Sequence, residues 1–199
     1  EPGGGGGGGR VYIRAVTADT SALTVQARAG ADGGSTAVTG GAGSYAKRRP
    51  GQTYPDLYID GSGVTPETTS PLVDASVSVA TFVVVNAARV TGTEVTATGD
   101  ANLTGTGTTV TLSTLTAAAD GKIASSVVVT LSSLSYTGSL TVKEGASVTV
   151  GTVSATNLTV STSSIQHFAQ DVGGLRLIVG GLFELQQGAT VTASARGYP

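Results

Sequence analysis

Short alternations of apolar and polar residues, repeated along residues 139–193, limit what this chain can fold into. Residues 140–142 (LTV), 148–150 (VTV) and 158–160 (LTV) each place aliphatic side chains on one face and a threonine on the other. A period of two residues is typical of β-strands, and Val, Thr and Leu suit a pleated, half-buried surface. The segment therefore predicts a series of short strands.

Two parts of this segment are near copies of each other. Residues 140–149 read LTVKEGASVT and residues 183–192 read FELQQGATVT, so a strand, a Gly-Ala corner and a second strand recur in the same order. Coils that repeat in this way are typical of a β-solenoid, in which each unit buries its apolar face against the next. The sequence thus predicts an all-β fold, a parallel β-helix or β-solenoid.

Composition favours the same architecture. Of 199 residues 30 are Gly, 12% are charged and 5% are aromatic, and Cys, Met and Trp are absent. The charged share is below the roughly 25% of an ordinary globular domain, and the hydrophobic fraction of 39% is too high for a disordered chain. A narrow core of stacked Val, Leu and Ala accounts for these values. Without Cys the chain can form neither a disulfide nor a thiolate zinc site.

We expect one continuous domain with three parts. Residues 1–29 form a glycine-rich start and the first coils, residues 30–71 form a long irregular insertion near the N-terminal third, and residues 72–199 form the solenoid coils. Long loops of this kind are often functional. Residues 76–85 give a strong strand signal, and the nearest approach to a helix is one or two turns at residues 164–171 (SIQHFAQD). The chain begins with Glu rather than Met, so we expect a piece of a longer polypeptide.

The coil period stays open. The near copies lie 43 residues apart, which suggests two coils of about 21 residues each. Five apolar residues spaced by 17–20 positions are candidates for one stack in the core, namely Leu103, Ile123, Leu140, Leu158 and Leu177.

The N-terminal segments carry a resemblance to a known class. Residues 7–15 read GGGRVYIRA, residues 23–34 read LTVQARAGADGG and residues 41–45 read GAGSY. In these segments the chain resembles the glycine-rich units of very large secreted surface proteins, which are repetitive right-handed parallel β-helix proteins. The resemblance implies an extracellular structural or adhesive role. It fails at residues 46–49 (AKRR), where the usual glycines are absent.

The insertion holds the densest charge in the sequence, at Lys47, Arg48 and Arg49. Such a run is compatible with a solvated loop, with a contact to an acidic neighbour or glycan, or with a proteolytic processing site. We treat these three residues as a possible contact cluster.

Two Asn-x-Thr sequons are candidate glycosylation sites, at Asn102 and Asn157. Both precede a Leu-Thr strand start, and they lie 55 residues apart, close to three coils of about 18 residues. If that period holds, both asparagines lie on one face of the solenoid. Their use would make the protein a secreted glycoprotein, whereas chance is the alternative because Thr is common in this chain.

We expect no catalytic, cofactor-binding or metal-binding residues, and therefore no enzyme. His167 is the single histidine, and no His, Asp and Glu cluster has metal-ligand spacing. A net charge of −2 without a basic stripe does not favour nucleic acid as a partner. No apolar run approaches the roughly 20 residues that span a membrane.

The sequence therefore predicts an extracellular or cell-surface structural protein, a building segment of a filament, appendage, sheath or large adhesin. Open solenoid ends are templates for strand pairing, so we expect copies of itself or neighbouring repeats to stack end to end, with glycans as further candidate partners. One alternative is a glycan-binding adhesin domain that uses residues 30–71. An ice-binding solenoid would need a coil-by-coil Thr array, which is not evident in the sequence, and a polysaccharide-active enzyme is the remaining alternative.

Overall fold

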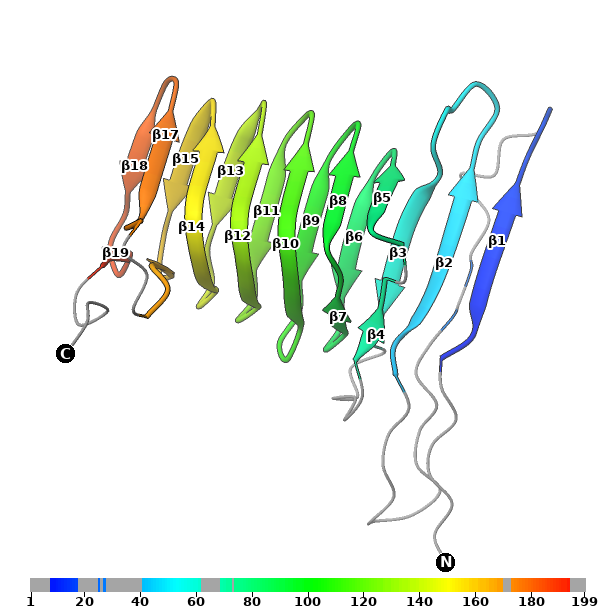
Figure 1. The fold of residues 1–199 in the computed structure, drawn as a ribbon, viewed down its shortest axis with the longest axis horizontal. Helices are drawn as coiled ribbons and strands as arrows, with labels where there is room; N and C mark the ends of the chain where they lie inside the picture. The colour runs from blue at the N-terminus through cyan, green and yellow to red at the C-terminus, as the bar shows by residue number, and fades with distance from the viewer. Residues whose placement is uncertain are drawn as a thin grey trace, which may run out of the picture.

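The computed structural model describes residues 8–17, 25, 27, 41–61, 69–72, 74–169 and 173–193. Within these ranges every regular element is a β-strand and none is a helix. The strands stack into a parallel β-solenoid of about five turns (Figure 1). The predicted fold class is therefore confirmed.

The first of two sheets has nine strands. In spatial order they are β1 (Arg10–Arg14), β2 (Gly43–Arg48), β3 (Asp56–Asp60), β6 (Phe82–Val85), β9 (Ala101–Thr104), β11 (Gly121–Ala124), β13 (Ser139–Val142), β15 (Asn157–Val160) and β18 (Phe183–Leu185). From β3 onward all neighbours in this sheet are parallel, one strand from each coil. We call the outward surface of β3 to β18 face A.

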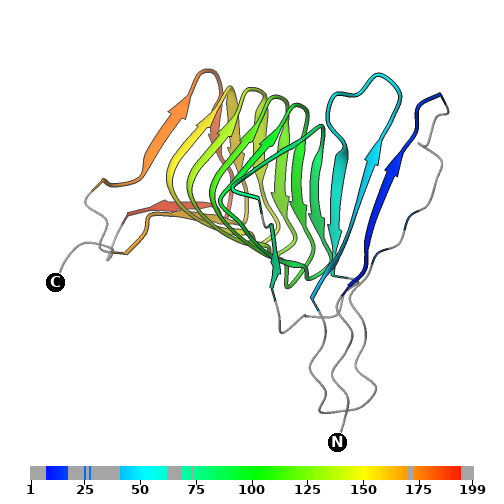
Figure 2. The same ribbon diagram turned by 45° about the vertical axis from the view of Figure 1, so that its right-hand side comes forward.

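The second sheet has ten strands. They are β4 (Ser70–Pro71), β5 (Ser76–Val79), β7 (Arg89–Thr91), β8 (Glu94–Ala97), β10 (Thr109–Ala117), β12 (Val128–Tyr136), β14 (Ser147–Ala155), β16 (Ser164–Gln166), β17 (Arg176–Val179) and β19 (Thr190–Thr192). Figure 2 shows how successive coils place equivalent strands one behind another.

Each coil has three sides, because the long strands bend. The first part of β10 pairs with β7 and its last part pairs with β8. Between them Ser113 and Thr114 both point outward, which interrupts the alternation of buried and exposed side chains. Face B is the outward surface formed by the first parts of the long strands β10, β12 and β14 together with β4, β7, β16 and β19. Face C is the outward surface formed by the last parts of these long strands together with β5, β8 and β17.

The register fixes the coil length that the sequence left open. Strand partners on face A are 18–20 residues apart between Phe82 and Asn157, and 25 residues apart between Leu158 and Phe183. The near copies indeed lie two coils apart, since Leu140 pairs with Leu158 and Leu158 with Phe183.

Of the predicted core stack, two neighbouring pairs are confirmed, Leu103 with Ile123 and Leu140 with Leu158. The other two steps are wrong. Ile123 pairs with Val142 rather than Leu140, and Leu177 pairs with Val153 in the other sheet. The reason is that coils differ in length at their corners, so equal spacing in sequence is not equal position in space.

The core is a narrow column of aliphatic side chains. Val110, Val129, Val148 and Ile165 lie above one another on successive coils and are fully buried. Burial of each such side chain contributes roughly 1.5–3 kcal/mol. Hydrogen bonds between parallel strands of neighbouring coils satisfy the backbone N–H and C=O groups. The core therefore has to hold only apolar side chains, and small ones suffice.

Tyr136 is a large aromatic residue in a core built mainly from aliphatic side chains. It follows Ala97 and Ala117 in the same column, and its ring occupies the space above Gly121, where any Cβ would overlap it. The Tyr136 hydroxyl donates a 3.1 Å hydrogen bond to the carbonyl oxygen of Ala101. Burial, with a smaller contribution from Asp100, raises the pKa of Tyr136 far above its usual value, so the phenol is neutral.

The corner between faces A and B is a column of residues with positive φ. Asn86, Gly105, Ser125, Glu144 and Thr162 succeed one another there with φ between 46° and 100°. Non-Gly residues rarely adopt this conformation, and here hydrogen bonds between coils hold it. The amide of residue 126 donates to the carbonyl of Glu144 at 2.8 Å, and the amide of residue 145 donates to that of Thr162 at 2.9 Å.

The N-terminal end departs from the prediction. Residues 43–60 are not irregular, because β2 and β3 form an antiparallel hairpin, and β3 is also the first strand of the solenoid. Residues 30–40 and 62–68 of the predicted insertion lie outside the described residues, and of residues 1–29 the structure describes only 8–17, 25 and 27. The strand β1 pairs in parallel with β2, so both run opposite to all other strands of this sheet.

Two further local predictions are refined. The strong strand signal at residues 76–85 becomes β5 and β6, separated by a corner at Ala80 and Thr81, which explains why apolar residues occur at both parities. Residues 164–166 are strand β16 rather than a helical turn.

Candidate functional site

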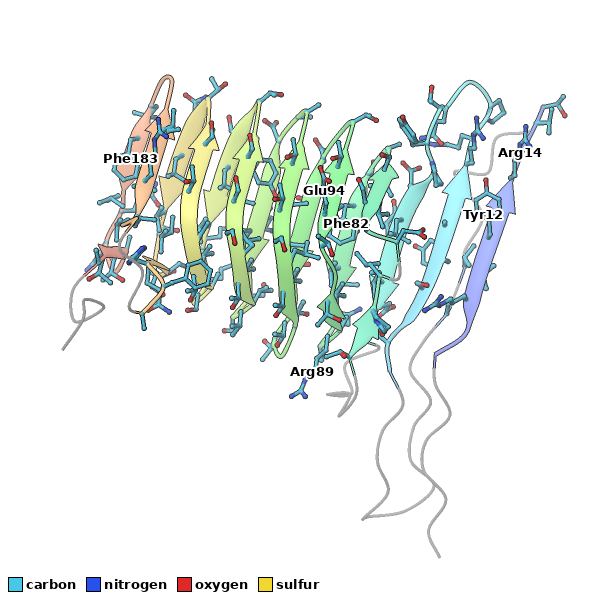
Figure 3. The ribbon with its side chains drawn as sticks, viewed as in Figure 1. Tyr12, Arg14, Phe82, Arg89, Glu94 and Phe183 are labelled. Carbon is cyan, nitrogen blue, oxygen red and sulfur yellow. The ribbon has the colours of Figure 1, made fainter. Side chains whose placement is uncertain are left out.

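The last coil presents an exposed apolar layer. Phe183 and Leu185 point inward, above Leu158 and Val160, which are fully buried. Phe183 and Leu185 are nevertheless 43% and 50% exposed, because no strand lies beyond β18 in the described part of the chain. Figure 3 shows Phe183 at this end of the stack, opposite to Tyr12 and Arg14. We call the layer the C-terminal end face; two further exposed apolar residues beside it are Ile178 and Leu182.

The opposite end of the solenoid contains a cavity of about 390 Å³. It lies between the first sheet and the strands β4 and β5, and aliphatic side chains of Leu57, Ile59, Leu72 and Val77 line it. Arg10 and Asp74 add one positive and one negative charge to the lining. The cavity forms because the first sheet continues beyond the coils through β2 and β1 (Figure 1).

An aromatic pair stabilises the hairpin on its outward side. The rings of Tyr45 and Tyr58 are stacked, with centroids 4.7 Å apart and planes 11° from parallel. The Lys47 ammonium lies 5.9 Å from the Tyr45 centroid, within cation–π range. Burial raises the pKa of both phenols; the neighbouring ring and Asp60 raise that of Tyr45 further.

The structure divides the predicted contact cluster. Lys47 belongs to the aromatic pair, whereas Arg48 and Arg49 line a smaller concavity of about 140 Å³ together with Arg14 of β1. Sequence reasoning missed Arg14, which lies 34 positions before Arg48 but is its direct partner in the β1–β2 register. The alternation of Arg10, Tyr12 and Arg14 was a signal that these side chains share a face, but not which strand would lie beside them.

Both sequons lie on face A, as the coil period predicts. Asn102 is in β9 and Asn157 begins β15, three coils further along, and both side chains are half-buried. The Asn157 amide nitrogen donates to Ser139 Oγ at 3.2 Å, and its oxygen accepts from the Leu182 amide at 2.9 Å. Asn157 therefore connects three coils, and a glycan on its nitrogen would leave one N–H there for the bond to Ser139. Glycosylation of either residue stays a prediction.

Faces B and C present a regular array of hydroxyl groups. Their side chains repeat about every 4.8 Å between coils and about every 6.7 Å along a strand. All outward positions of β10, β12 and β14 are uncharged, and all except Val128 and Gly151 carry a hydroxyl. One column on face B is Thr91, Thr111, Thr130, Thr149, Gln166 and Thr192.

This array corrects the sequence-based impression that no coil-by-coil Thr ladder exists. Partners in it are separated by 20, 19, 19, 17 and 26 positions, so no single period reveals them.

The one histidine of the chain does not belong to a cluster of metal-ligating side chains in the described ranges. His167 is buried beside β19, where its amide donates to the Thr192 carbonyl at 3.2 Å. Those ranges contain no group of three or more His, Cys, Asp and Glu residues that could hold a metal ion. Nor does a helix of membrane-spanning length and hydropathy occur in them.

A comparison of the chain with protein-family models, with curated proteins and with solved structures gives no match. The fold itself therefore defines the class of this protein, a three-sided parallel β-solenoid with an antiparallel hairpin at its N-terminal end.

Proposed function

We propose that this chain is a non-enzymatic, extracellular structural protein, a β-solenoid segment of a filament, appendage, sheath or large adhesin that assembles by end-to-end stacking. The observation that carries the proposal is the C-terminal end face. Its Phe183 and Leu185 occupy core positions of a coil yet remain about half exposed. The low charge, the glycine-rich segments and the two sequons support an extracellular location.

A further β-coil is the surface that fits this end face best. In the described part of the chain β18 is an edge strand, which offers backbone donors and acceptors to an added strand. An added coil would cover the apolar layer as β18 covers β15. At the other end β1 is also an edge strand in the described part of the chain. The covering coil comes from a neighbouring repeat of a longer polypeptide or from a second copy.

Assembly should depend on the end face. We expect the 199-residue chain to associate with increasing concentration, and the Phe183→Lys/Leu185→Lys variant to remain a monomer. Two aliphatic or aromatic side chains contribute roughly 3–6 kcal/mol when buried, so the variant should weaken association at least about 100-fold. Sedimentation velocity measures this constant, and electron microscopy shows whether the associated species are filaments.

The control is Val128→Lys, which places a lysine on an exposed apolar residue on face B, away from the ends. It should associate as the unaltered chain does. A chain that stays monomeric at millimolar concentration, or an end-face variant that associates normally, would contradict the proposal.

A second candidate function, ice binding, is favoured by the hydroxyl array on faces B and C. The outward positions of β10, β12 and β14 form an uncharged grid made mostly of hydroxyls, which can order water into a lattice with similar spacing. Thermal hysteresis of the purified protein tests this candidate directly. We expect Thr130→Lys, in the middle of face B, to remove most of the hysteresis.

The control for this test is Thr141→Lys, an equally half-buried threonine on face A, which should have no effect. A solution of the unaltered protein without hysteresis or ice shaping would eliminate ice binding and leave the structural proposal untouched.

A further inference from the structure

Two arginines lie side by side at the N-terminal end, and in the described part of the chain neither forms an ion pair with an acidic residue. Arg14 and Arg48 are direct neighbours in the parallel register of β1 and β2, and their side chains line the same concavity. Like charges on adjacent strands destabilise a sheet. Arg49 completes the lining, and it already contacts Asp56. The arrangement thus concentrates positive charge where the fold alone would avoid it.

The hairpin turn holds two of these guanidinium groups in place. Pro50 and Gly51 form the turn, with Gly51 at a φ of 79° and the Gln52 amide donating to the Arg49 carbonyl at 3.2 Å. Arg48 Nε donates to the Gln52 carbonyl at 2.9 Å. Arg49 Nη2 lies 3.0 Å from Asp56 Oδ2, and Gln52 Nε2 bonds the other carboxylate oxygen of Asp56 at 3.2 Å.

This anchoring leaves donors for a ligand. Arg48 is bonded through Nε, and no acceptor in the described ranges bonds its terminal nitrogens. Asp56, by contrast, has a side chain only 7% exposed and both oxygens engaged. The carboxylate therefore orients Arg49 rather than neutralising the whole cluster.

The concavity has the size for one anionic group. Its volume of about 140 Å³ exceeds that of a few water molecules, at roughly 30 Å³ each. Ala15, Val16 and Pro50 supply an apolar part of its wall. Tyr12, on the same side of β1 as Arg14, is 60% exposed (Figure 3). Apolar wall and exposed ring suit the CH faces of a sugar that carries the anion.

Charge complementarity selects the partner. Three of the eleven Lys and Arg residues of the chain line this one concavity, although the whole chain has a net charge of −2. A long polyanion such as nucleic acid would continue along a solenoid that is not basic, and strong binding to phosphates needs many such contacts. An acidic sugar needs the local cluster alone.

We propose that Arg14, Arg48 and Arg49 form a binding site for a carboxylate or sulfate group of an acidic polysaccharide. Guanidinium forks bind both groups through paired hydrogen bonds. The site lies at the end opposite to the C-terminal end face, and none of its three arginines belongs to that face. Two of its residues, Arg48 and Arg49, belong to the cluster that the sequence suggested for glycan contact, and the proposal names the chemical group that they would bind.

Binding of defined oligosaccharides to the full 199-residue chain tests the site. The probes are a sulfated heparin oligosaccharide, a carboxylated oligogalacturonate, a neutral dextran and an oligonucleotide with the same number of charges. We expect one of the acidic saccharides to bind at least 10-fold more tightly than dextran and the oligonucleotide, and the tighter of the two identifies the anionic group. Calorimetry at fixed salt concentration gives the dissociation constants.

The decisive variant is Arg14→Gln/Arg48→Gln, which should weaken that binding at least about 10-fold, as expected for the loss of charge-assisted bonds. Its control, Arg89→Gln/Arg176→Gln, removes the same charge from the solenoid and should change binding less than twofold. Arg14→Lys/Arg48→Lys keeps the charge and the fold but loses the paired geometry, and should be intermediate. Equal losses in both glutamine variants, preference for the oligonucleotide, or no binding to either acidic saccharide would overturn the proposal.

Discussion

Replacing Gly121 by valine is expected to destabilise the solenoid by about 3 kcal/mol or more. A Cβ at this position would overlap the ring of Tyr136, which is 2% exposed and has no free space to move into. Overpacking of a close-packed core usually costs about 1–3 kcal/mol, and more when a ring cannot shift. Denaturant unfolding followed by far-ultraviolet circular dichroism measures the change. Gly180→Val is the control, because an added Cβ there meets no atom within 4 Å.

A double-mutant cycle identifies the cause. Tyr136→Ala alone should cost about 3–5 kcal/mol, since it leaves a cavity and removes the hydrogen bond to Ala101. In the Gly121→Val/Tyr136→Ala protein the valine enters that cavity. The double variant should therefore be more stable than the sum of the two single changes predicts. Additive costs would show that Gly121 is required for another reason, such as its backbone conformation.

The sequence predicts the fold but not this pair. Alternation in the segments around Leu140 and Leu158 and the two near copies suffice for a β-solenoid, because strands and corners are local properties. The contact between Tyr136 and Gly121 depends on how far each corner turns. The corners contain Asn86, Ser125 and Glu144 in a conformation usually associated with Gly, so their geometry leaves little trace in the sequence.

The hairpin could have been predicted, whereas the arginine site could not. Tyr45 and Tyr58 lie on strands of alternating residues joined by a turn that contains Pro50-Gly51, which is a hairpin signal. The many Gly, Ser and Thr residues around it favoured an irregular loop instead. The site, however, needs Arg14 beside Arg48, a parallel pairing that bridges residues far apart in the chain and that no local pattern specifies.

Removal of one whole coil should leave a folded protein. Deletion of residues 121–139 joins Asp120 to Leu140, and Gly121 and Leu140 are register partners. In the intact protein Leu115 and Val153 both pair with Leu134, one on each side. The deletion removes Leu134 and so places β10 directly on β14, with Leu115 above Val153. It also removes Gly121 and Tyr136 together, so neither is left without the other. Since solenoid stability is close to a sum over units and their interfaces, we expect a shorter, somewhat less stable, cooperatively unfolding solenoid.

Deletion of about half a coil, residues 121–130, should abolish cooperative folding. It would move part of β12 into the place of β11, and corner residues such as Ser125 would disappear while the corners of the neighbouring coils remain. Circular dichroism, thermal melting and limited proteolysis compare the two deletions. If the half-coil deletion folds as well as the whole-coil deletion, coil-to-coil register does not specify this structure, because register is the property that distinguishes them.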